Sequence, residues 1–386
     1  MQFIDLEAQQ KLIRADVDRR IAAVLDHGKY IMGPEVAELE EVLAEYVGSE
    51  HAISCSSGTD ALVMPLMARG FGPGDIVITS PFTFMASAEV ISLLGATPVF
   101  VDIDPVTYNM DPDALEKAIE AIQKGDRSIY PLPENLDFEN SRLAAVIAVD
   151  MFGLPADYPR IEAICKAHDL LLIEDAAQSF GGAIGDARSC SFGHVATTSF
   201  FPAKPFGCYG DGGMIFTNDA DLADVMRSIR VHGKGEDKYD NKRIGLNARL
   251  DTLQAAILLA KWELFGDEVD ARQRIADRYA SLLASEVPAV TPPATPEGFS
   301  SAWAQYTIRC GGRRADYQAA LSDAGIPSAV YYPSPLHLQT AYAQLGYVKG
   351  SLAASEEASA DVLSLPFGPY LRDEDMDKVV ACLARV

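Results

Sequence analysis

The chain has 386 residues, more than one hydrophobic core usually serves, so its length favours two domains. Its 55 acidic residues outnumber 32 basic ones and give a net charge of −23, which argues against non-specific binding to nucleic acid. The start of the chain lacks the pattern of a signal peptide, and no apolar run reaches the length of about 18 residues that a membrane span needs, so we expect a cytoplasmic protein with no membrane partner.

The cysteines are widely spaced and form no Cys-x-x-Cys pair, which argues against a zinc site and against a disulfide framework. We therefore expect no metal centre and predict buried free thiols. The six residues are Cys55, Cys165, Cys190, Cys208, Cys310 and Cys382.

Short, nearly continuous apolar runs alternate with amphipathic stretches along the first part of the chain. This alternation predicts an α/β fold with a mostly parallel sheet covered by helices on both faces. Ligands collect at the carboxyl ends of the strands in such sheets. The predicted strands are residues 51–55, 76–80, 98–102, 145–150, 170–175, 195–201 and 214–217.

The first strand is followed by the sequence SSGTDAL, which opens a helix. Gly58 lets the backbone approach a ligand closely, Ser57 and Thr59 offer hydroxyls, and the helix N-terminus attracts a phosphate. A simple N-cap is an equally good interpretation of these residues alone. Pro65 should kink or shorten the helix.

Two further segments come before the fifth strand. Phe84, in the sequence PFTFMA, could lie over a flat cofactor, although core packing explains a single phenylalanine as well. Residues 123–142 are polar, contain two prolines and form a longer connection than most, which predicts a surface excursion.

The fifth predicted strand ends at Asp175, and Lys204 follows 29 positions later. This pair is what a pyridoxal 5′-phosphate enzyme needs, because the lysine carries the cofactor aldehyde as a Schiff base and the acid keeps the pyridine nitrogen protonated. A glycine-rich turn, residues 207–213, would let the chain pass tightly around a bulky cofactor.

The C-terminal part of the chain is predicted to form a separate, smaller unit. Residues 250–283 carry a helical pattern that could bend near Gly266, and prolines at 288–296 indicate a connection. A strand at 306–310 and helices at 314–324 and from Asp373 onward then fit a small α/β domain. We predict a large cofactor-binding domain, 1–265, and a small C-terminal domain, 266–386.

Several motifs in order resemble the DegT/DnrJ/EryC1/StrS family of nucleotide-sugar aminotransferases: SSGTDAL, PFTFMA, IEDAAQSFG, SFFPAKPFGCYGDGG and NARLDTLQAAIL. The resemblance runs from FIDLEAQQ to SLPFGPYL and so covers nearly the whole chain. It implies fold type I of pyridoxal phosphate enzymes, the aspartate aminotransferase fold, with a seven-stranded sheet, and a homodimer with shared active sites.

The resemblance also implies site residues. Lys204 and Asp175 match the catalytic lysine and the acid that faces the pyridine nitrogen, and Gln178 matches the partner of the phenolic oxygen. Phe84 and Ala177 match residues on the two ring faces. The phosphate would be held by Ser57, Gly58, Thr59, Ser199 and, from the neighbouring subunit, Asn247.

The substrate is indicated by residues 238–252, which resemble the branch that aminates C3 of 3-keto sugars, and most of all the enzymes acting on UDP-2-acetamido-2-deoxy-3-oxo-glucuronate for surface polysaccharides. Arg249 would pair with the sugar carboxylate or the diphosphate, although a structural ion pair is the alternative. Further residues in segments that border the substrate in relatives are Tyr30, Tyr331, Tyr332 and His337.

The implied reaction has two halves, with L-glutamate leaving as 2-oxoglutarate, pyridoxamine 5′-phosphate as the intermediate, and the keto sugar as acceptor. Three alternatives stay open at this point: an aminotransferase for a neutral dTDP-3-keto-deoxysugar, a pyridoxamine-dependent sugar dehydratase, and a non-catalytic regulatory relative. Lys204 argues against the dehydratase, whose family members carry histidine in its place.

Overall fold

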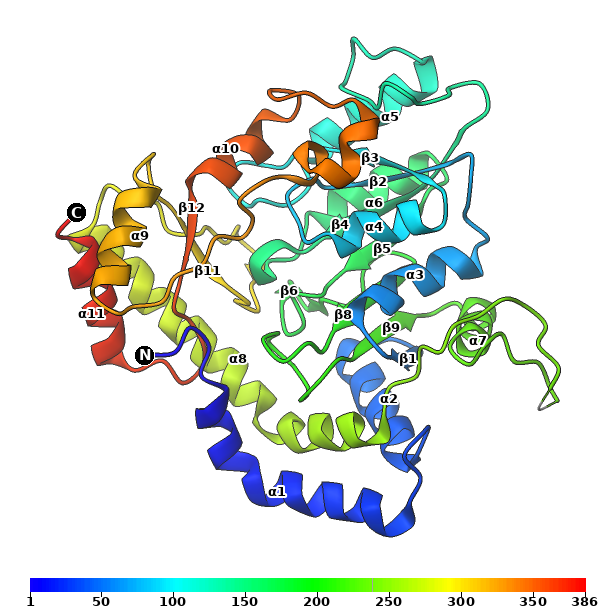
Figure 1. Ribbon diagram of the computed structural model, residues 1–386, viewed down its shortest axis with the longest axis horizontal. Coiled ribbons are helices and arrows are strands. Elements are labelled where there is room, and N and C mark those ends of the chain that lie inside the picture. The colour runs from blue at the N-terminus through cyan, green and yellow to red at the C-terminus, as the bar shows by residue number, and fades with distance from the viewer. Residues whose placement is uncertain (238) are drawn as a thin grey trace.

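The computed structural model describes residues 1–237 and 239–386, and its central feature is a seven-stranded sheet (Figure 1). All seven predicted runs form its strands, which are β1 (His51–Cys55), β2 (Asp75–Thr79), β3 (Thr97–Phe100), β4 (Arg142–Val149), β5 (Leu171–Asp175), β8 (Val195–Ser199) and β9 (Gly213–Thr217). Their order is β1-β9-β8-β5-β4-β2-β3, and only β9 runs against the others. The mostly parallel α/β fold predicted from the sequence is confirmed.

The sheet is buried on both faces because alternate residues of its strands join different apolar clusters. On β2, Ile76 and Ile78 belong to one cluster and Val77 to the other, as the period of two in a strand requires. The first face is covered by α5 (Pro112–Lys124) and α6 (Tyr158–Ala167), and the second by α3 (Gly58–Ala68), α4 (Ala86–Leu93) and α7 (Ala220–Ile229).

Local sequence signals explain where several of these helices begin. Ser57 caps α3, and the aspartates Asp111, Asp157 and Asp219 cap α5, α6 and α7, each side chain accepting a hydrogen bond from an amide in the first turn. Such caps satisfy backbone donors that have no partner inside the helix. Pro65 lies near the end of α3, which stops three residues later.

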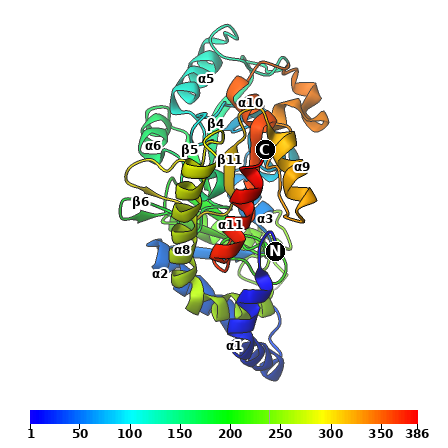
Figure 2. The same cartoon turned by 90° about the vertical axis from the view of Figure 1, so that its left-hand side faces the viewer.

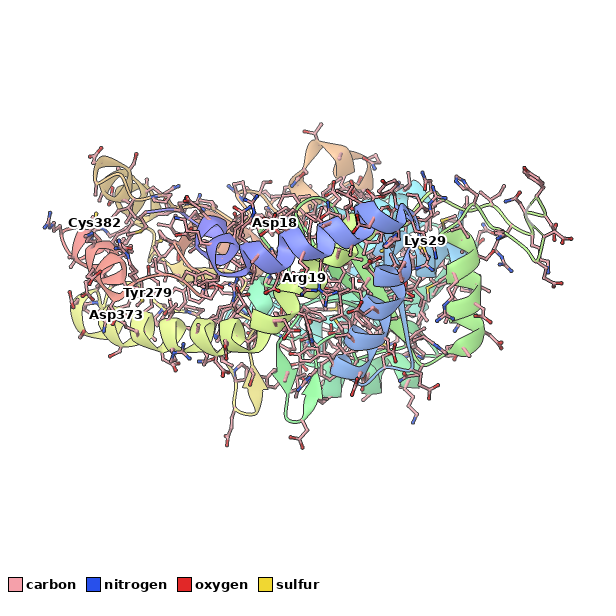
Figure 3. All side chains as sticks on the ribbon, turned by 90° about the horizontal axis from the view of Figure 1, so that it is seen from below. Asp18, Arg19, Lys29, Tyr279, Asp373 and Cys382 are labelled. Atoms are coloured by element: carbon pink, nitrogen blue, oxygen red, sulfur yellow. The ribbon has the colours of Figure 1, made fainter. Side chains whose placement is uncertain are left out.

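A single long helix, α8 (Thr252–Glu286), joins the sheet to the C-terminal part of the chain and changes direction along its course (Figure 1). The helix α1 (Leu6–His27) lies beside it, as the side view in Figure 2 and the view from below in Figure 3 both show. The first half of α8 packs on the sheet side together with α2 (Pro34–Val47). The predicted domain boundary at 265 falls inside this continuous helix, and the division into two domains stays a prediction.

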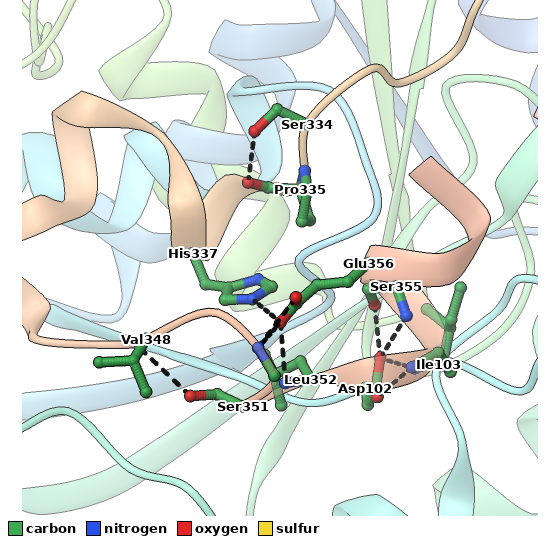
Figure 4. Close-up of polar contacts among 12 residues, drawn as sticks. Asp102, Ile103, Ser334, Pro335, His337, Val348, Ser351, Leu352, Ser355 and Glu356 are labelled. Carbon is green, nitrogen blue, oxygen red and sulfur yellow. Dashed lines mark hydrogen bonds and ion pairs between the residues drawn. The ribbon is translucent and has the colours of Figure 1, made fainter. Parts of the chain in front are cut away.

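The second half of α8 belongs to a separate apolar cluster around Tyr279, whose hydroxyl donates to the Pro366 carbonyl at 3.0 Å (Figure 3). The cluster is built with an antiparallel pair, β11 (Tyr306–Arg309) and β12 (Val362–Leu365), and with α9 (Arg314–Asp323) and α11 (Asp373–Leu383). Asp102, just beyond β3, accepts hydrogen bonds from the amides of Ala354 and Ser355 at the start of α10 (Ala353–Asp361), which ties this part to the sheet (Figure 4).

Residues 123–142 lie mostly at the surface, as predicted, but several contacts hold the segment in place. Arg127 donates to the carbonyls of Pro133, Glu134 and Leu136 and lies 4.5 Å from the centre of the Phe138 ring. Tyr130 is buried, and its hydroxyl accepts the Asp102 amide at 2.8 Å. Most of the segment is exposed, as its polar composition predicted, while a few buried apolar residues and one arginine organise it.

The six cysteines are free, and five of them are buried while Cys382 is half-buried. Among the described residues, no group of three or more His, Cys, Asp or Glu side chains could hold a metal ion. Within the same residues, no helix combines the length and the apolar character that crossing a membrane requires.

Candidate active site

Asp175 and Lys204 lie at one edge of the sheet because their strands are neighbours. Asp175 is the last residue of β5, where it pairs in register with Thr197 of the parallel strand β8. The chain leaves β8 at Ser199 and turns at Lys204, whose amide donates to the Phe201 carbonyl at 2.9 Å. Burial lowers the pKa of the Lys204 amine below its ordinary value, and the charge of Asp175 opposes this shift.

The Asp175 carboxylate is buried and held by two donors. The Ser87 hydroxyl donates to Oδ2 at 2.7 Å and the Ala177 amide to Oδ1 at 3.2 Å. Burial raises the pKa of Asp175, while these hydrogen bonds and the charge of Lys204 oppose the rise. The sequence prediction did not include Ser87; its place in the first turn of α4, three residues after Phe84, is the signal that could have found it.

Gln178 is fixed three residues beyond Asp175 in the turn that follows β5. The Phe152 amide donates to its Oε1 at 3.0 Å, and the side chain is buried. Burial raises the pKa of Tyr332, the charge of Asp175 adds to the rise, and a hydrogen bond with Gln178 opposes it. The structure thus brings Tyr332, from the C-terminal part, together with Gln178 and Asp175.

The turn between β1 and α3 forms a small cradle against the end of β8. Ser57 Oγ accepts the Asp60 amide at 3.0 Å, so the predicted N-cap is present. Gly58 and Thr59 are the first residues of α3, so their amides have no carbonyl acceptor within the helix. A Cβ atom on Gly58 would lie 2.8 Å from Ser199 Cβ, which shows how closely the two segments approach.

The segment that carries Asn247 and Arg249 runs beside this cradle, since the Ser56 amide donates to the Ala248 carbonyl at 3.1 Å. Asn247 is exposed. Arg249 is half-buried, and within residues 1–237 and 239–386 its enclosed Nε has no hydrogen-bond partner and its guanidinium forms no ion pair. The structural ion pair considered from the sequence is therefore not seen. Lys238, in the same segment, lies outside the described residues.

Phe84 and Tyr30, two aromatic residues predicted for the site, are exposed to solvent. Phe84 is 58% exposed, although most phenylalanines are buried, and Tyr30 is 49% exposed. The Tyr30 carbonyl accepts the Thr252 amide at 3.1 Å, which places it at the start of α8. Tyr331 is half-buried and lies 6.4 Å from Phe3, between ring centres.

His337 is placed differently from the other predicted substrate residues. Only 1% of it is exposed, and Nε2 lies 3.1 Å from Oε1 of Glu356, toward which it points in Figure 4. Burial lowers the pKa of the ring, and Glu356 opposes the shift. This contact favours a role in packing the segment after Tyr332 over contact with a sugar.

This chain is similar to known aminotransferases, in agreement with the arrangement of Asp175 and Lys204. A model of the DegT/DnrJ/EryC1/StrS aminotransferase family matches residues 11–384. The chain is 47% identical, over 99% of both chains, to the UDP-2-acetamido-2-deoxy-3-oxo-D-glucuronate aminotransferase of Pseudomonas aeruginosa.

Solved structures give the same result. An aminotransferase of this family from Brucella abortus has 51% sequence identity and a TM-score of 0.93, covering 99% of this chain and 98% of its own. NtdA from Bacillus subtilis, solved with bound pyridoxamine phosphate, has 29% identity and a TM-score of 0.84, covering 99% of this chain and 82% of its own. The resemblance noted in the sequence is confirmed, and this chain is an aminotransferase that belongs to the DegT/DnrJ/EryC1/StrS family.

Proposed function

We propose that this aminotransferase uses pyridoxal phosphate to aminate C3 of UDP-2-acetamido-2-deoxy-3-oxo-glucuronate with L-glutamate, for surface polysaccharide synthesis. The observation that carries the proposal is the buried Asp175 carboxylate, held by Ser87 and Ala177 beside Lys204. A buried, hydrogen-bonded acid next to a lysine of lowered pKa is an arrangement with a clear catalytic use and a cost in stability.

The residues present fit the cofactor. Ser57, Gly58, Thr59 and Ser199 would hold its phosphate, because the first amides of α3 are free to donate and the cradle is too narrow for a side chain at Gly58. The exposed ring of Phe84 would cover one ring face and Ala177 the other, with Gln178 at the phenolic oxygen. When bound, pyridoxal phosphate supplies an aldehyde that takes an amine and a ring that withdraws electrons.

Lys204 would hold the cofactor and move protons in both halves of the reaction. Its Nζ would take the proton from Cα of L-glutamate and pass it to the bound cofactor in the first half, and would carry a proton from the cofactor to C3 of the sugar in the second. Burial lowers its pKa, which increases the fraction of neutral amine able to act as a base. The buried Asp175 carboxylate would stabilise a positive charge on the pyridine nitrogen of the cofactor, because the two opposite charges would lie close together.

The choice of sugar rests on the Pseudomonas aeruginosa relative and on Arg249, whose enclosed Nε has no partner in the described chain. A guanidinium fork suits a carboxylate or a diphosphate. We also propose a homodimer in which Asn247, exposed on each chain, reaches the phosphate held by the other.

A reverse half-reaction tests the substrate. The pyridoxal form, recognised by a visible absorbance that L-glutamate bleaches, is mixed with candidate amino sugars. The UDP-3-amino-uronate should bleach the absorbance, and an Arg249→Ala protein should react far more slowly with it than with L-glutamate. Bleaching by a neutral dTDP-3-amino sugar alone would contradict the substrate, and a protein without the glutamate-sensitive absorbance would contradict the cofactor.

A further inference from the structure

Lys261 is a buried lysine on α8 that the proposed reaction does not use. Only 2% of it is exposed, and its Nζ donates to the Gly207 carbonyl at 2.5 Å while lying 4.6 Å from the centre of the Tyr209 ring. Gly207 follows Lys204 by three residues. The amine therefore contacts the backbone of the loop that presents the catalytic lysine.

Keeping an ammonium group at this place is unfavourable. Burial lowers the pKa of Lys261 to about 8, and the nearby Glu268 and Cys208 only partly oppose this. A methionine of similar length would fill the same space without the desolvation cost of a charge. Packing alone thus gives no reason for the amine, whereas its hydrogen bond to Gly207 does.

The loop that Lys261 contacts is a closed turn. The Cys208 amide donates to the Phe200 carbonyl at 2.8 Å, and the Lys204 amide donates to Phe201. A Cβ atom on Gly207 would lie 2.5 Å from the Phe201 oxygen, so the two ends of the turn touch. A shift of the Gly207 carbonyl would therefore move the turn that carries Lys204.

The helix α8 holds this segment at a second point, because Gln254 Oε1 accepts the Tyr209 amide at 2.9 Å. One contact fixes the end of the turn and the other the chain just beyond it. The helix thus forms a rigid support under residues 204–209.

We propose that Lys261 is a positioning residue for Lys204, which fixes the turn through the Gly207 carbonyl and so sets where the Lys204 amine stands relative to Asp175. The inference rests on the proposed function, because it needs Lys204 to move the proton. A displacement of about 1 Å can cost on the order of 10²-fold in rate, even when the mutated residue is remote from the chemistry.

The test compares Lys261→Met and Lys261→Arg with Arg272→Met. Arg272 is a matched control, since it is also a buried cation on α8 (6% exposed) that donates to a backbone carbonyl, that of Trp303 at 2.9 Å, but lies in the other half of the helix. The measurements are the single-turnover rate with L-glutamate, the pH titration of the visible absorbance of the bound cofactor, and the melting temperature.

Lys261→Met should lower the rate by about 10² and shift the pH midpoint of the absorbance, while Lys261→Arg restores most of the rate because it keeps the donor. Arg272→Met should melt earlier but keep the wild-type rate and midpoint. A rate and midpoint unchanged in Lys261→Met, or equally changed in Arg272→Met, would overturn the inference. Should Lys261→Met not fold, Lys261→Gln takes its place with the same criteria. A wild-type protein that does not react with L-glutamate would instead count against the proposed function.

Discussion

At Asp175, burial and hydrogen bonding act on one carboxyl group in opposite directions. Burial raises its pKa, while the Ser87 hydroxyl, the Ala177 amide and the charge of Lys204 stabilise the ionised form. The acid can serve a positively charged ring only when it is ionised. The hydroxyl of Ser87, which makes no contact with any reacting atom in the proposed reaction, should therefore influence the rate through the pKa of Asp175.

We expect Ser87→Ala to raise the pKa of Asp175 further, since a hydrogen bond to a charged group contributes about 1.5–3 kcal/mol. The acidic limb of the pH–rate profile for the L-glutamate half-reaction should move upward by about one to two pH units. Thr83→Val is the control, because Thr83 bonds to Ser87 at 3.1 Å but not to Asp175. A limb that moves equally in both variants would show that Ser87 has no specific effect.

Gly58 provides a second test at a single position. In Gly58→Ala, the new methyl group would meet Ser199 at 2.8 Å and close the cradle, so cofactor affinity should fall by about 10-fold or more. Gly266→Ala is the matched control, because a Cβ there meets no atom within 4 Å and alanine favours a helix by about 1 kcal/mol. Titration with pyridoxal phosphate measures both. If the two variants bound pyridoxal phosphate equally well, the cradle would not be part of the cofactor site.

Two neighbouring strands carry a buried pair of acids at their carboxyl ends, beside Asp175. Asp150, after β4, accepts the Tyr158 hydroxyl at 2.7 Å, the Ala156 amide at 2.9 Å and the Ser179 hydroxyl, and the carboxyl group of Glu174 on β5 accepts the amides of Cys190 and Phe192. Burial raises the pKa of Asp150 to about 7, and burial together with the charge of Asp150 raises that of Glu174 well above its ordinary value.

These shifts predict how stability depends on pH. In the unfolded chain both carboxyls are ionised above about pH 5, whereas the folded protein retains protons, so the free energy of unfolding should fall as the pH rises from about 5 to 8. The slope is about 1.4 kcal/mol per pH unit for each retained proton. Glu174→Gln removes one titrating group and should flatten the slope in urea unfolding experiments. Identical slopes in the variant and the wild type would contradict this assignment.

At the level of elements, the sheet could be predicted because strands buried on both faces need continuous apolar runs, which are visible locally. The surface position of residues 123–142 could be predicted too, but their internal contacts could not, because these depend on Arg127 reaching three carbonyls and on Tyr130 meeting Asp102. The contact between His337 and Glu356 could not be predicted either, because only the path of the C-terminal segment makes the two residues neighbours.

The residues of the site were predicted unevenly for a related reason. Asp175 ends one strand and Lys204 follows the next, and the order of the sheet then places both at the carboxyl ends of neighbouring strands. Ser87 and Lys261 act through atoms that belong to other segments, Asp175 Oδ2 and the Gly207 carbonyl. The position of Ser87 just after the PFTFMA sequence hinted at the site, but Lys261 carries no local motif, and only the folded chain reveals both contacts.

For the whole molecule, the proposed homodimer makes a prediction that a single chain cannot satisfy. If Asn247 serves the neighbouring site, Asn247→Ala and Lys204→Ala proteins, each nearly inactive, should regain activity when refolded together. Random pairing gives one intact site in half of the dimers, or about a quarter of wild-type activity. Activity assays of mixed and separately refolded samples measure this. No gain on mixing, with dimers present, would place Asn247 in its own chain's site.

The cradle proposed for the phosphate joins segments that lie far apart in the chain and are synthesised at different times. Ser57 and Gly58 leave the ribosome early, but Ser199 meets them only after β8 and β9 have joined β1, and α8 must then form to hold the Gly207 turn. A nascent chain therefore has no place for the coenzyme until most of it exists, because contacts between distant segments form late in folding. With the proposed cradle, uptake of pyridoxal phosphate would thus mark the end of folding and not its beginning.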